Sequence, residues 1–98
     1  MIVAFEGEVF RWEARTETWF FVALPEDLSD EIREIPRPAR GFGSVRVAVT
    51  IGGSSWRTSI FPDGGRRAYV LPLKRAVREA EGIGDGDVVQ VEVDVIDG

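Results

Sequence analysis

The sequence predicts a mainly β fold: a small barrel of about six strands with two short helices, in one domain over residues 1–98. Several stretches alternate apolar and polar residues with a period of two, which is typical of strands with one buried face. Glycine-rich turns separate these stretches, and only two segments have the apolar spacing of a helix. A chain of 98 residues is long enough to bury one core without disulfides.

The first strand changes its alternation partway along. Apolar residues occupy odd positions from Val3 to Val9, whereas Phe10 and Trp12 are apolar at even positions. A pattern that slips by one residue indicates a β-bulge near residues 7–9, or a strand that bends from one sheet to another. Small, strongly curved barrels need such bends.

A polar hairpin connection at residues 15–18 leads to a second strand, residues 19–24, which is apolar on both faces. We expect this strand to be central and covered on both sides. Its aromatic residues Trp19, Phe20 and Phe21 can form a ligand platform or pack in the core, and core packing is the preferred interpretation.

The first helix is expected to begin at Pro25, followed by two acidic residues that suit the helix dipole. Its apolar stripe is Leu28, Ile32 and Ile35, and the prolines at positions 36 and 38 end it. Residues 37–43 are expected to form a loop. This loop is either a solvated connector, which we prefer, or a mobile basic loop beside a site.

The remaining elements are four strands and a second helix. The strands are expected over residues 44–51, 56–61, 68–71 and 89–95, and the last of them has an acidic outer face. The helix is expected over residues 72–81, with Leu73, Val77 and two alanines on its buried side. Gly82 occupies the position of the left-handed residue that commonly ends a helix.

Composition excludes several kinds of chemistry. The sequence has neither Cys nor His, which removes disulfides, thiolate nucleophiles, the usual zinc ligands and the usual general base. The turn at residues 62–66 lacks the spacing of a phosphate-binding loop. We therefore expect no catalytic residue, no metal site and no cofactor. Neither a signal peptide nor an apolar run of about 20 residues is present, so we expect a cytoplasmic protein without membrane contact.

Charge is unevenly distributed along the chain. The formal net charge is −5, but residues 33–78 carry +8 between two acidic ends of −6 and −7. The basic and acidic strands can lie side by side and neutralise each other, which is the preferred interpretation. Alternatively, the fold can gather the arginines on one face that binds an anion.

Four cationic residues are candidates for such a face. Arg46 and Arg57 lie on adjacent expected strands, and Lys74 and Arg78 share one face of the second expected helix. If the helix packs beside the two strands, the four side chains can converge, and guanidinium groups suit phosphate or carboxylate. Otherwise each cation pairs with an acidic residue of the last strand, such as Glu92 or Asp94.

Five motifs follow one another over nearly the whole chain. They lie at residues 19–25 (WFFVALP), 45–52, 56–62 (WRTSIFP), 69–74 (YVLPLK) and 82–89. In this order they resemble a prokaryotic family of small domains of unknown function, whose members occur alone or fused to a YdeI/OmpD-associated, bacteriocin-protection-like domain. The resemblance implies a double-split β-barrel, the fold of the AbrB/MazE/MraZ-like DNA-binding proteins. It implies no activity, but its motifs include the polar residues Arg57, Ser59, Lys74 and Arg78.

These observations favour a non-catalytic binding or interaction module for an anionic small molecule or a partner protein. The alternative is a nucleic-acid-binding regulator of the AbrB-like kind, which the net charge of −5 disfavours. An enzyme without His or Cys chemistry is the third hypothesis. The sequence is compatible with a monomer or a homodimer.

Overall fold

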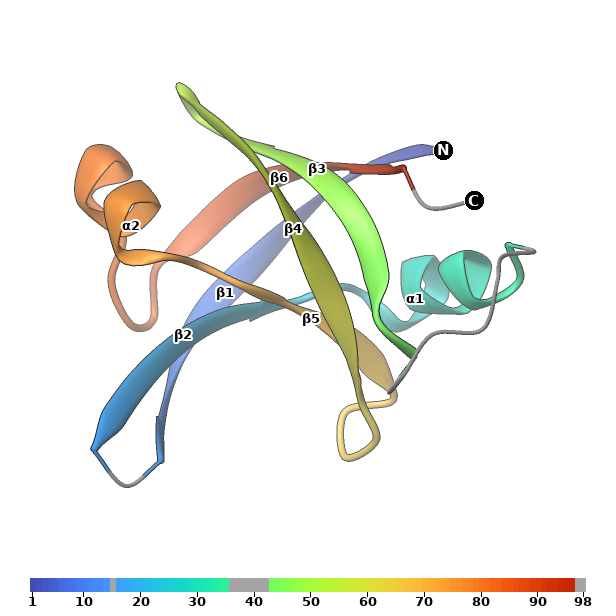
Figure 1. Cartoon of the computed structure of the whole chain (residues 1–98), viewed down its shortest axis with the longest axis horizontal. Coiled ribbons are helices and arrows are strands. Elements are labelled where there is room, and N and C mark those ends of the chain that lie inside the picture. The colour runs from blue at the N-terminus through green and yellow to red at the C-terminus, as the bar shows by residue number, and fades with distance from the viewer. Residues whose placement is uncertain (15, 36–42, 97–98) are drawn as a thin grey trace.

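The computed structural model describes residues 1–14, 16–35 and 43–96. Within these residues, six strands and two helices form a closed barrel with the strand order β1-β2-β5-β4-β3-β6 (Figure 1). All neighbouring strands are antiparallel. The elements are β1 (Ile2–Ala14), β2 (Glu17–Ala23), α1 (Glu26–Arg33), β3 (Val45–Ile51), β4 (Ser54–Asp63), β5 (Ala68–Pro72), α2 (Arg75–Glu81) and β6 (Val88–Val95). The predicted mainly β barrel with two short helices is confirmed.

Two long strands, β1 and β4, each pass from one sheet to the other. The first half of β1, up to Glu8, pairs with β6, and the second half, from Val9, pairs with β2. Strand β4 pairs with β3 as far as Ile60 and with β5 from Phe61 onward. The predicted bend near residues 7–9 is therefore confirmed, and it lets one strand serve both sheets of the barrel.

The core fills the barrel interior with aliphatic side chains from alternating strand positions. In β3 the inward residues run from Val45 to Ile51 at every second position, as predicted, and Arg46 is exposed between them. In β6 the side chains of Val91, Val93 and Val95 are buried. This alternation leaves the acidic residues of β6 on the outside of the barrel.

Helix α1 covers one end of the barrel and α2 lies near the opposite end (Figure 1). Pro25 is the N-cap residue of α1. In the apolar stripe, Ile32 is fully buried, and the partly buried Leu28 and Ile35 pack against the core. Ser29, which the apolar pattern did not single out, is also fully buried. The predicted loop at residues 37–43 and the prolines at 36 and 38 lie outside the described residues, apart from Gly43. No helix among the described residues is long and apolar enough to cross a membrane.

Helix α2 begins three residues later than the sequence predicted. Pro72 still belongs to β5, where it lies opposite Phe21, and the backbone N–H of Leu73 donates to the Phe20 carbonyl at 2.8 Å. The helix is short, so Val77 is its buried residue, and the two alanines, Ala76 and Ala80, are exposed. The prediction that Gly82 ends this helix is confirmed, because Gly82 adopts a left-handed conformation with φ of 64°.

The prediction that residues 19–24 form a strand covered on both sides is wrong for its first half. Strand β5 pairs with β2 only along residues 21–23, because the chain leaves the sheet after Pro72. The earlier residues of β2 therefore extend past β5 as a hairpin with β1, and the Trp19 side chain is 44% exposed. Val22 and Leu24, further along, are buried as expected.

Candidate anion-binding groove

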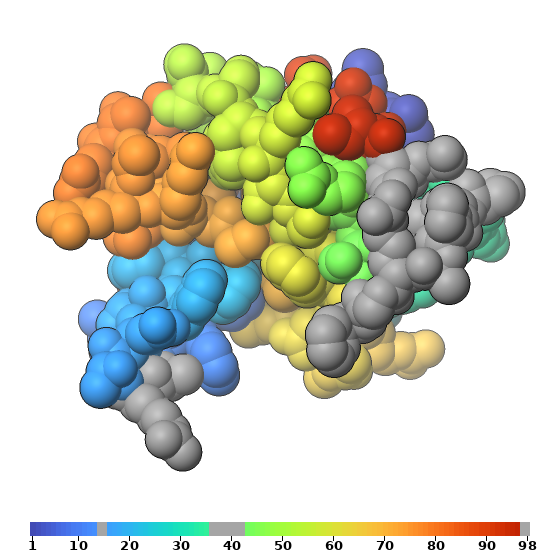
Figure 2. Space-filling model, viewed as in Figure 1, coloured from blue at the N-terminus to red at the C-terminus, as the bar shows by residue number. Residues whose placement is uncertain are grey.

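A groove of about 510 Å³ lies between the uncovered edge of β2 and the start of α2. Figure 2 shows α2 in orange above the hairpin of β1 and β2 in blue, with β4 in yellow-green beside both. The groove exists because β5 stops pairing with β2 at Pro72 and the chain then turns away into α2, which leaves the first residues of β2 without a neighbouring strand on this side. Its walls are Glu17, Thr18, Trp19, Phe20, Trp56, Arg57, Thr58, Pro72, Leu73, Lys74, Arg75 and Arg78.

Arg78 is the most firmly held cation in this groove. Its Nε donates to the Leu73 carbonyl at 3.2 Å, and its guanidinium carbon lies 4.1 Å from the centre of the Phe20 ring. Stacking on an aromatic face stabilises a guanidinium and fixes its plane. In the described part of the chain no carboxylate forms an ion pair with Arg78, and its terminal nitrogens make no hydrogen bond. These nitrogens are consequently available to a ligand.

The end of α2 is fixed to the neighbouring hairpin, which holds Arg78 in place. Glu81 accepts a hydrogen bond from the Ser54 hydroxyl at 2.7 Å and from the Gly53 backbone N–H at 3.4 Å. Val77 packs inward from the middle of the same helix. Because α2 is anchored at its end and its middle, the Arg78 side chain starts from a defined backbone position.

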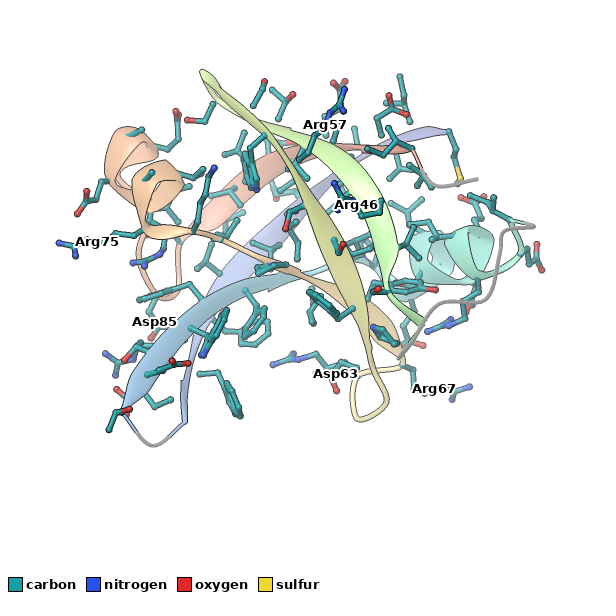
Figure 3. All side chains as sticks on the ribbon, in the orientation of Figure 1. Arg46, Arg57, Asp63, Arg67, Arg75 and Asp85 are labelled. Carbon is teal, nitrogen blue, oxygen red and sulfur yellow. The ribbon has the colours of Figure 1, made fainter. Side chains whose placement is uncertain are left out.

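Lys74 and Arg75 stand at the mouth of the groove and differ in their availability. Lys74 directly precedes α2, is exposed, and has no ion-pair partner within residues 1–14, 16–35 and 43–96. Arg75 projects outward from α2 (Figure 3), where its Nε lies 2.9 Å from Glu79. Glu17 is the one carboxylate on the walls, and it accepts a hydrogen bond from the Trp19 indole at 3.1 Å. The walls therefore carry a formal excess of three positive charges.

The other predicted site residues lie along the outer face of β3 and β4. Arg57 lines the rim of the groove, and its neighbour across the sheet is Ala48. Arg46 is exposed and lies opposite the half-buried Ser59, and neither contributes to the groove. Figure 3 shows Arg46 and Arg57 over the β3–β4 ribbon, away from Arg75. The fold thus brings Arg57, Lys74 and Arg78 to one groove and leaves Arg46 and Ser59 outside it.

The preferred interpretation of the charge pattern, pairing between basic and acidic strands, does not describe these cations. Arg46, Arg57, Lys74 and Arg78 form no ion pair with β6 in the described residues. Where side chains do pair, the partners are close in sequence, as in Arg11–Glu13, Arg33–Asp30, Arg66–Asp63 and Arg75–Glu79. Asp94 of β6 instead lies 3.8 Å from the N-terminal ammonium group.

A second groove, of about 540 Å³, lies on the other face of the hairpin and is aromatic. Phe10 and Phe21 stack with ring centres 5.7 Å apart, and the Arg66 guanidinium carbon lies 3.9 Å from the centre of the Phe10 ring. Trp12 is 53% exposed beside them. The cations on this wall have carboxylate partners nearby, since Arg66 pairs with Asp63 and Arg11 with Glu13. Unlike the first groove, this surface has no described cation that lacks an ion-pair partner.

Sequence reasoning missed the aromatic side of the first groove. It preferred core packing over a ligand platform for Phe20, and this half-buried ring does pack against the core, but it also supports Arg78. Trp56 is also half-buried, and it lines the groove while packing partly against the core. The available signal was the double-faced apolar character of residues 19–24, which is ambiguous until the end of β5 is known.

Comparison with known proteins places this architecture in a family. Residues 5–93 match the family model described as a domain of unknown function, DUF1905, in agreement with the resemblance and the barrel. The comparison with curated proteins gave no significant match. The chain belongs to the DUF1905 family, whose function is not established.

Proposed function

We propose that the protein is a non-catalytic binding module whose groove, between the edge of β2 and the start of α2, holds an anionic ligand. The observation that carries this proposal is Arg78. Its Nε is bonded to Leu73 and its flat face rests on Phe20, while its terminal nitrogens remain free of protein partners among the described residues. A guanidinium fixed in this way loses little freedom when it binds, so its hydrogen bonds to an anion contribute more affinity.

The charge and chemistry of the walls support an anion as the ligand. Lys74 and Arg57 add two cations without ion-pair partners in the described chain, although the whole protein has a net charge of −5. Hydrogen bonds from a guanidinium to carboxylate or phosphate are charge-assisted and about twice as strong as neutral ones. A positive groove on an acidic protein also favours selectivity, because the surrounding surface repels other polyanions.

Two further parts of this proposal rest on the sequence. A catalytic role is disfavoured because the sequence has no His and no Cys, the side chains that most often serve as base or nucleophile near neutral pH. A cytoplasmic location stays a prediction, as does the choice between a monomer and a homodimer.

Binding of nucleic acid is the weaker candidate. The barrel likeness to AbrB-like proteins concerns the fold, and function belongs to sites rather than folds. Neutralising a duplex backbone takes several phosphate contacts, whereas the groove offers three cations that have no ion-pair partner among the described residues.

A thermal-shift screen tests the proposal. The protein is heated with nucleotides, tripolyphosphate, dicarboxylates, acidic peptides and short DNA or RNA duplexes, each at low and moderate salt. We expect at least one class of small or peptidic anion to raise Tm in a salt-sensitive manner, because a ligand that binds only the folded state stabilises it.

Matched variants assign the effect to the groove. Arg78→Gln and Lys74→Gln should remove most of the stabilisation, whereas Arg46→Gln, which removes an exposed arginine outside the groove, should retain it. If no anion raises Tm, or if Arg46→Gln removes as much stabilisation as Arg78→Gln, the groove is not the anion site. Stabilisation by duplexes alone would support the nucleic-acid alternative.

A further inference from the structure

The groove has a second chemical feature besides its cations: an unpaired strand edge. We propose that its ligand is an acidic, extended segment of a partner protein, which adds as a strand to the free edge of β2 while its carboxylates face Arg78 and Lys74. This inference rests on the proposed function, since it names the class of anion that the same groove takes.

The hydrogen-bond pattern shows which way the edge of β2 points. Phe20 lies opposite Arg11 in the β1–β2 pair, and the Phe20 carbonyl accepts from Leu73, on the side away from β1. The Arg11 N–H likewise points away from β2, to the Asp85 carboxylate at 3.0 Å. In an antiparallel pair, residues alternate between bonding to their partner strand and bonding outward. Thr18, two residues before Phe20, therefore directs its own N–H and C=O outward, into the groove.

Nothing in the described residues occupies this edge. The backbone of Thr18, an exposed residue on the wall of the groove, forms no hydrogen bond with any other described residue outside the β1–β2 hairpin. Strand β5 would have covered it, but the chain turns into α2 after Leu73. Unpaired strand edges of this kind bind extended peptides through main-chain hydrogen bonds.

The faces of β2 predict the pattern of the added strand. Thr18 and Phe20 point to one face of the hairpin, the face on which Arg78 stacks, whereas Trp19 points to the other and stacks on Phe21. Side chains of an added strand alternate in the same way. Every second residue of the segment therefore faces Arg78 and Lys74 and is acidic, and the residues between them are apolar and lie beside Trp19.

This occupant uses more of the groove than a free anion does. A small phosphate or carboxylate can satisfy the terminal nitrogens of Arg78, but it leaves the Thr18 amide groups and the exposed Trp19 ring unused. A strand with alternating carboxylates satisfies the charged wall, the polar edge and the aromatic ring together. Its main-chain groups continue, at Thr18, the hydrogen bonding that β5 provides further along β2.

The test uses synthetic peptides and the whole chain. The first probe is acetyl-Glu-Leu-Glu-Leu-Glu-amide, and the second has the same composition in blocked order, acetyl-Leu-Leu-Glu-Glu-Glu-amide. Affinity is measured by isothermal titration calorimetry for wild type, Arg78→Gln and Arg46→Gln. We expect the alternating peptide to bind at least about tenfold more tightly than the blocked one, with the difference lost in Arg78→Gln and kept in Arg46→Gln.

A scan of backbone N-methylation separates strand addition from simple charge attraction. Methylating one amide of the alternating peptide at a time leaves its charge unchanged but removes one N–H donor. We expect a loss of about tenfold or more only at every second amide, because alternate amides of an added strand face β2.

The outcomes distinguish the two proposals. If both peptides bind equally, lose affinity in Arg78→Gln and tolerate methylation at every amide, the groove is an anion site but strand addition is overturned. If neither peptide binds, strand addition is also overturned, and stabilisation by tripolyphosphate that Arg78→Gln abolishes would still support the proposed function. An alternating loss along the methylation scan would support strand addition.

Discussion

Arg78 makes two contacts that each constrain a different feature of its guanidinium group. The Leu73 carbonyl accepts a hydrogen bond from Nε, and the Phe20 ring fixes the plane of the group. Lysine has the same charge but neither a planar face nor a second set of donors. The identity of the cation therefore matters beyond its charge.

Replacing Arg78 by lysine tests this point. Arg78→Lys keeps the formal charge and should weaken binding of an acidic peptide about tenfold, or about 1.4 kcal/mol, because the fork and the stacking on Phe20 are lost. Isothermal titration calorimetry measures the change, and Arg46→Lys serves as the control. Equal affinity of wild type and Arg78→Lys for the peptide would mean that the charge at position 78 alone determines binding.

Ser29 is a polar residue of α1 whose side chain is completely buried. Its hydroxyl oxygen accepts the backbone N–H of Tyr69 at 3.0 Å, which joins α1 to β5. Ser29→Ala leaves that N–H without this acceptor and should lower the free energy of unfolding by about 1–3 kcal/mol. Urea denaturation measures the loss.

The control for this prediction is Ser55→Ala. Ser55 is exposed and its hydroxyl lies 3.1 Å from the Thr50 hydroxyl, so its loss should cost less than about 0.5 kcal/mol. Similar losses for Ser29→Ala and Ser55→Ala would contradict a structural role of the buried serine.

Among the elements, β1 has the most demanding path, because it passes from one sheet to the other beside Gly7. A Cβ atom at this position would lie 2.6 Å from Val22 Cγ1 and 3.4 Å from the Ala23 carbonyl oxygen. Gly7→Ala should therefore destabilise the fold by about 1–3 kcal/mol through overpacking. Chemical denaturation checks this value.

Gly64→Ala is the matched control for Gly7→Ala. Apart from Gly64 itself and its two chain neighbours, no described residue has an atom within 4 Å of a Cβ built on Gly64, and its φ is not in the left-handed region. We expect little change in stability there, within about 0.5 kcal/mol. If Gly7→Ala left the free energy of unfolding unchanged, the two sheets could separate at the crossing without cost.

Elements with a clean local pattern could be predicted from the sequence. The alternation in β3 and β6 fixes which residues are inside, since a shift of one residue would expose every valine. The start of α2 could not be predicted from the sequence. Proline suits the first turn of a helix, but Pro72 is the last residue of β5 and lies opposite Phe21 of β2. The exposure of Trp19 had the same origin, since it depends on where β5 ends.

The candidate site was predictable in part, for a related reason. Lys74 and Arg78 were expected together because they are four residues apart, and both line the groove. Arg46 and Ser59 do not reach it, because they lie at the end of the β3–β4 hairpin remote from the turn that Glu81 contacts. Which of the predicted residues line the groove therefore depends on the position of α2 in the fold, which the sequence pattern does not give.

In the molecule as a whole, barrel closure depends on β6, which pairs with both β1 and β3. Val93 is fully buried on this strand, and Val88, on the same strand, is 59% exposed. Val93→Ala should lower the free energy of unfolding by about 2–3 kcal/mol, from lost apolar burial and a residual cavity. Val88→Ala should change it by less than about 0.5 kcal/mol.

Thermal unfolding followed by tryptophan fluorescence and by circular dichroism checks this prediction. The two signals should move to lower temperature together in Val93→Ala, since the tryptophans lie away from β6 in sequence and report the whole barrel. Unfolding of β6 alone, with the tryptophan signal unchanged, would contradict a single closed unit.

The most direct measurement is an NMR titration of ¹⁵N-labelled protein with tripolyphosphate at low salt. If the groove is the anion site, the Arg78 Nε–H signal and the backbone amides of Thr18 and residues 74–78 should shift together and saturate. The amides of Arg46 and Ser59 should stay unchanged. Shifts centred on Arg46 and Ser59, or spread evenly over all arginines, would contradict the assignment of binding to the groove.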